Sequence, residues 1–143
     1  MPVFASQGRD ELREMWVEAW RKRRAGLPAE PLEAELADVA GEHPEYHDIL
    51  EGDEGALHRD WTPEQGQSNP FLHMGLHVAV REGIVTDRPP GIAAIAQSLR
   101  TRLGSGHEAE HQLLECLAET LWEAQRAGLP PDQDTYLEKA RQR

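Results

Sequence analysis

The chain has 143 residues and a formal net charge of −11, with 38% hydrophobic and 29% charged side chains. This length can bury a real core, so we expect one domain over residues 1–143. The acidic balance disfavours nucleic acid and anionic membrane surfaces as partners. Cys116 is the only cysteine, which excludes an intramolecular disulfide and a zinc site with several cysteine ligands. There is no apolar run of about 18 residues and no signal-peptide core, so we expect a cytoplasmic protein.

Hydrophobic periodicity predicts helices throughout the chain and no strands. Prolines at helix starts and glycines at helix ends set most of the boundaries. We expect helices over residues 9–25, 31–41, a short one after 44, 70–85, 92–103, 107–127 and 132–141, with a loop over 51–68. The result would be an all-α fold, a compact bundle of about four main helices plus short accessory helices. The helices over 70–85 and 107–127 should form its inner pair.

Six of the seven histidines form three pairs at i, i+4 spacing, which are His43/His47, His73/His77 and His107/His111. On a helix this spacing places two imidazoles one above the other, where both can reach one metal ion. The spacing therefore predicts a metal site built from helices. The first pair has the weakest case, because Pro44 places His43 at a helix cap.

The second and third pairs lie on the most apolar helices. At about 100° per residue, the line through His73 and His77 continues through core-type residues of its helix. The line through His107 and His111 does the same. Buried imidazoles need partners for both ring nitrogens, and a metal ion would satisfy the lone pair of each. We therefore expect His73, His77, His107 and His111 as ligands, joined less securely by His43 and His47.

Several carboxylates accompany the third histidine pair. Glu108 and Glu115 are candidate ligands or hydrogen-bond partners, since the Glu-x-x-His spacing of Glu108 and His111 occurs in carboxylate-bridged di-iron bundles. Glu110 completes an H-x-x-E-H string that matches one class of zinc peptidases. We give that match little weight, because those enzymes need a further acidic ligand in a larger domain.

Imidazole suits iron, zinc, copper and nickel, so several metals fit the predicted ligands. The centre could hold one ion or two. The ligand set is similar to haemerythrin-like di-iron sites and to coupled dicopper sites, and haem between two histidines is a further option. Such a site could bind O₂, carry out redox chemistry, activate water or sense metal. The alternative is a metal-free regulatory or adaptor domain with structural buried histidines. Neither the reaction nor the oligomeric state follows from the sequence.

Three strings resemble those of a family of small bacterial proteins known as a domain of unknown function. They are HPEYH, NPFLHMGLHVAVRE and HEAEHQLLECLAETLWEAQRAG. The resemblance covers most of the chain, from the first helix to the last. It implies a compact helical domain in a cytoplasmic bacterial protein and implies no particular activity.

Overall fold

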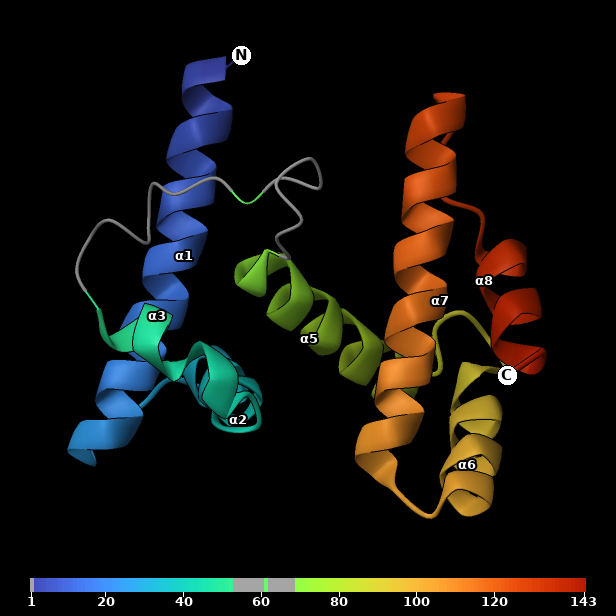
Figure 1. Ribbon diagram of the computed structural model, residues 1–143, viewed down its shortest axis with the longest axis horizontal. Coiled ribbons are helices and arrows are strands. Elements are labelled where there is room, and N and C mark those ends of the chain that lie inside the picture. Colours follow the sequence, from blue (N-terminus) through green and yellow to red (C-terminus); the bar gives the residue numbers. More distant parts are fainter. Residues whose placement is uncertain (1, 53–60, 62–68) are drawn as a thin grey trace. The chain divides into compact units, whose positions relative to one another are not determined.

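The computed structural model describes residues 2–52, 61 and 69–143, with side chains from residue 8 onward. All regular elements in these ranges are helices, which confirms the all-α prediction (Figure 1). They are α1 (Pro2–Ala25), α2 (Pro31–Gly41), the 3₁₀ turn η1 (Pro44–Tyr46), α3 (His47–Glu51), α5 (Pro70–Thr86), α6 (Ile92–Leu103), α7 (Gly106–Ala127) and α8 (Gln133–Arg141). Most of the expected loop over 51–68, including Leu57 and His58, lies outside the described residues.

The start of α1 is a correction to the sequence prediction. The helix begins at Pro2, seven residues before the expected start at Arg9. Proline is well suited to the first turn of a helix, where its missing N–H has no intrahelical partner. Gly8 is a weak helix former, and the helix runs through it.

The described chain separates into two compact units, residues 1–74 and 75–143, and the division falls inside α5. The expectation of a single domain stays a prediction. In unit 1, α2 and α3 lie beside the C-terminal half of α1 (Figure 1). Trp16, Leu36 and Leu50 are buried there. An ion pair joins α1 to α2, because the Lys22 ammonium lies 2.8 Å from a Glu33 carboxylate oxygen.

In unit 2, α7 contacts both α6 and α8 (Figure 1). The core of the unit joins one apolar face from each helix; its buried members are Val80, Ile92, Ala96, Leu99, Ala109, Leu113, Leu114, Cys116, Tyr136, Leu137 and Ala140. The Ser105 hydroxyl caps α7 by accepting from the backbone N–H of Glu108, and Gly128 ends the helix at φ +68°. The Ser105 cap thus defines the histidine-bearing start of α7, and Gly128 defines its end.

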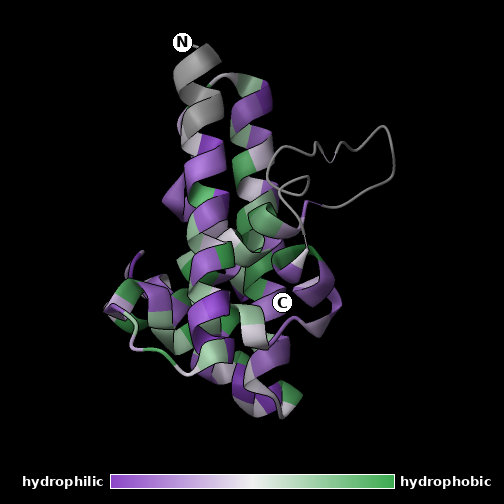
Figure 2. Cartoon of the chain, turned by 90° about the vertical axis from the view of Figure 1, so that its left-hand side faces the viewer, coloured by the Kyte–Doolittle hydropathy of each residue, from purple (hydrophilic) through white to green (hydrophobic). Residues whose placement is uncertain are grey.

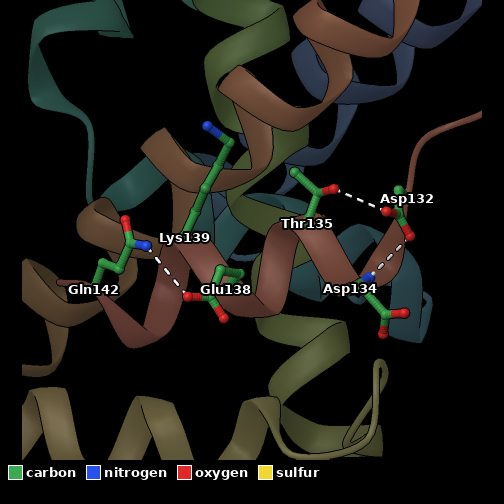
Figure 3. Close-up of a pocket in the computed structure, with 6 residues that line it drawn as sticks. All are labelled: Asp132, Asp134, Thr135, Glu138, Lys139 and Gln142. Atoms are coloured by element: carbon green, nitrogen blue, oxygen red, sulfur yellow. Dashed lines mark hydrogen bonds between the residues drawn. The ribbon is translucent and has the colours of Figure 1, made fainter.

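The last helix shows how short polar side chains define a boundary. Asp132 accepts from the backbone N–H of Asp134 and from the hydroxyl of Thr135 (Figure 3). Further along the same exposed face, Gln142 donates to Glu138. The capping carboxylate also suits the positive end of the helix dipole.

Along the coloured part of α1, hydrophilic residues are interspersed with hydrophobic ones, as expected for a helix with one buried face (Figure 2). Among the described residues, no helix combines the length and the apolar character needed to cross a membrane.

The central helix for the site is α5. The Asn69 side chain caps it by accepting from the backbone N–H groups of Phe71 and Leu72. The helix is continuous from Pro70 to Thr86, so His73 and His77 stand on consecutive turns of one face.

Candidate metal centre

In unit 1, three rings pack together where α2 ends. His43 meets His73 edge to face, with the ring centroids 5.0 Å apart. Tyr46 stacks on His43 at 5.6 Å with an interplanar angle of 4°. The ligand nitrogens of His43 and His73 lie within 4.8 Å of one another, so the two side chains can contribute to the same ion.

The hydrogen bond of His43 defines which of its nitrogens could bind a metal. The ring is 1% exposed, and its Nδ1 lies 2.7 Å from the carbonyl oxygen of Val39. A carbonyl can only accept, so Nδ1 carries the proton and the buried Nε2 carries the lone pair. A carbonyl that orients the ring through the opposite nitrogen is the usual support of a metal-binding histidine.

His47 has different surroundings from those of His43, although the two are four residues apart. Its ring stacks on Trp20 with centroids 4.3 Å apart, and its Nε2 donates to the carbonyl of Ala40 at 2.8 Å. The reason is the backbone of His43, whose φ of −124° and ψ of 67° are not helical. The i, i+4 rule applies only when both residues are in the helix. The structure therefore places His47 in the packing of α1 against α3.

In unit 2, His77 is held by a carboxylate. The ring is 0% exposed, and its Nε2 lies 2.6 Å from Oε2 of Glu110 on α7. Arg81, one turn further along α5, places its Nε 3.2 Å from each Glu110 oxygen. The carboxylate orients the ring, with Nε2–H as donor, and leaves the buried Nδ1 as the nitrogen with the lone pair.

Electrostatics keep Glu110 ionised in this position. Burial by itself would raise the pKa of the carboxyl group, but the hydrogen bond from His77 and the positive charge of Arg81 outweigh it and lower the pKa. An ionised carboxylate behind an imidazole makes that imidazole a stronger ligand.

The two histidines of α7 both contact His77. The ring of His111 is half-buried and lies 5.3 Å from that of His77, and their ligand nitrogens are within 4.8 Å of one another. His107 is exposed, 5.9 Å from His77 and 4.3 Å from His111 between ring centroids. The first two turns of α7 therefore combine an exposed and a sheltered imidazole.

The two carboxylates expected near the histidines have different surroundings. Glu115 is exposed and lies 2.7 Å from the guanidinium of Arg143. Glu108 is exposed, and its backbone N–H donates to the Ser105 cap. Glu110, by contrast, lies 2.6 Å from Nε2 of His77. Spacing around α7 could not have selected Glu110, because it lies roughly 100° from His111, whereas Glu115 lies roughly 40° from it.

Four histidines of the described chain each offer one ring nitrogen as a possible metal ligand, His43 and His73 in unit 1 and His77 and His111 in unit 2. Two of them, His43 and His77, have the opposite nitrogen fixed by an acceptor. All four donors are imidazoles, which suit zinc, copper, nickel and iron better than magnesium or calcium. The arrangement fits a transition metal.

The family model described as a domain of unknown function, DUF1841, matches residues 8–142. The chain therefore belongs to this family, which confirms the resemblance seen in the three histidine-bearing strings. No curated protein and no solved structure matches the chain.

Proposed function

We propose that this member of the DUF1841 family binds a divalent transition-metal ion through four histidines, His43, His73, His77 and His111. The observation that supports the proposal most directly is the hydrogen bonding of the two fully buried members. Val39 holds one nitrogen of His43, and Glu110 holds one nitrogen of His77. Each ring therefore presents the lone pair of its other nitrogen, as a metal ligand must.

The geometry of α5 supports joining these ligands in one centre. His73 and His77 share a face of this helix, one turn apart. His43 contacts the first of them and His111 contacts the second. A single ion bound by the two α5 histidines would have a further imidazole beside each.

Four imidazoles complete a tetrahedral coordination shell. Closed four-ligand shells are typical of structural zinc sites, whereas hydrolytic sites keep one position for water. We therefore propose that the ion stabilises the fold or reports metal availability, and that it does not activate water. Zinc suits this role best, because it accepts tetrahedral nitrogen ligation.

Metal analysis of protein purified without a histidine tag tests the proposal. We expect close to one equivalent of metal, and His77→Ala or His111→Ala should remove most of it. His47→Ala and His58→Ala are the matched controls and should retain it, since both remove an imidazole outside the proposed ligand set. Bound metal should also raise the unfolding temperature as its concentration rises above Kd.

Metal content below about a tenth of an equivalent, with no change in unfolding temperature on adding zinc, copper, nickel or iron, would contradict the proposal. The histidines would then belong to the alternative function, a metal-free regulatory or adaptor domain in which they are part of the packing.

A further inference from the structure

We infer that His107 is the entry ligand of the centre, the side chain that takes a metal ion from solvent and passes it to His77 and His111. This inference rests on the proposed function. Its basis is the contrast between the three rings of unit 2. His107 is exposed, His111 is half-buried and His77 is 0% exposed.

The contacts provide a continuous route from the surface to the buried ring. His107 lies 4.3 Å from His111 and 5.9 Å from His77 between ring centroids. His111 lies 5.3 Å from His77. An ion held by the exposed ring is thus already next to both of the deeper rings.

A hydrated divalent ion cannot enter a buried site intact, because its water shell is larger than the ion and is strongly held. The waters must be exchanged for protein ligands in steps. An exposed imidazole can replace the first water while the rest of the shell stays in solvent. His111 and then His77 can replace further waters, so no step needs a bare ion. Each entry step breaks one metal–water bond and forms one metal–nitrogen bond, and in the last step the bond to His107 is exchanged for a bond to a retained histidine.

Among the three histidines of unit 2, His77 and His111 have ring nitrogens within 4.8 Å of one another and form a possible ligand set, which does not include His107. A permanent ligand would be expected within that set. A ring that contacts two of its members from the solvent side is placed to transfer the ion and to be released. The i, i+4 pair on α7 thus divides into a retained ligand, His111, and a transfer ligand, His107.

The test compares metal-transfer rates in the wild-type chain and His107→Ala. Zinc is presented on a chromophoric chelator, and its uptake is followed by stopped-flow absorbance; release is followed in the reverse direction with excess chelator. We expect the variant to slow uptake and release by about tenfold each, while Kd stays within about threefold of wild type. Equal slowing in both directions is required, because the ion leaves by the route it enters.

His58→Ala serves as the control for loss of an imidazole elsewhere, and His111→Ala as the control for loss of a retained ligand. The first should leave rates and Kd unchanged, and the second should weaken Kd strongly. Wild-type rates in His107→Ala would overturn the inference while leaving the metal site in place. So would a loss of affinity as large as that of His111→Ala, because His107 would then be a permanent ligand. If the wild-type chain takes up no zinc, copper, nickel or iron, the proposed function itself fails.

Discussion

Replacing Glu110 by Gln tests whether the carboxylate behind His77 strengthens a metal ligand. In the structure the Glu110 oxygen lies 2.6 Å from Nε2 of the His77 ring, and the side chain is 17% exposed. Gln keeps an oxygen that can accept this hydrogen bond but removes the negative charge. The ring should keep its orientation and lose part of its basicity.

The size of the effect follows from the position of the carboxylate. Removing a group that supports a metal-binding histidine weakens metal affinity by about 10- to 100-fold, or about 1.4–2.7 kcal/mol. Glu110→Gln should fall near the lower limit, because the hydrogen bond can persist. Glu110→Ala should fall near the upper limit, because it also leaves Arg81 without its two 3.2 Å contacts to the carboxylate.

Competition between the protein and a chromophoric chelator for zinc measures Kd directly. Glu115→Gln is the matched control, since it makes the same change on the same helix and also interrupts an arginine contact, at 2.7 Å from Arg143. We expect it to bind zinc as the wild type does. Wild-type affinity in Glu110→Gln and Glu110→Ala would refute the role assigned to this carboxylate, and so would an equal loss in Glu115→Gln.

Three further predictions concern the fold and are read by chemical unfolding. Leu113→Ala should lower the free energy of unfolding by about 2–5 kcal/mol, because the side chain is 0% exposed in the core of unit 2; a loss below about 1 kcal/mol would contradict that packing. Gly75→Ala and Gly83→Ala should have opposite signs although both lie in α5. At Gly75 a Cβ meets nothing within 4 Å, so Ala should stabilise by up to about 1 kcal/mol, whereas at Gly83 it would lie 2.8 Å from the carbonyl oxygen of Arg88 and should destabilise; effects of the same sign would contradict this reasoning. Burial, with a smaller contribution from the nearby Cys116, raises the pKa of the Tyr136 phenol from 10.0 to about 12. The folded state therefore favours the neutral phenol, and the stability from this preference is complete below pH 10 and declines between about pH 10 and 12, by about 2.7 kcal/mol in total. Tyr136→Phe should lack this decline, and an unchanged alkaline profile would contradict it.

Much of the fold could be predicted because its boundaries depend on local chemistry. Asn69 and Pro70 begin α5, Asp132 caps α8, and Gly128 ends α7, each through hydrogen bonds or backbone angles within a few residues. The exception is the start of α1, where no strong stop or cap marks the boundary. Pro2 suits the first turn of a helix, but Gly8 separates it from the apolar stripe that set the predicted start.

The site was only partly predictable, because helical spacing determines direction but not environment. The line through His73 and His77 could be read from the sequence, and His77 is buried as expected. The same reasoning treated His107 and His111 as equals. In the structure they differ in exposure, since burial depends on what the neighbouring helices cover.

The sequence by itself determined the helices and the presence of three histidine pairs, because both depend on residues a few positions apart. Only the tertiary structure decided which ring nitrogen of each histidine is held by an acceptor and which carboxylate supports the site. The Val39 carbonyl holds His43, and the Glu110 carboxylate holds His77. The second contact joins residues that are 33 positions apart in the sequence. Hydrogen bonds over such separations form only when packing brings two helices together, so no local pattern could assign them.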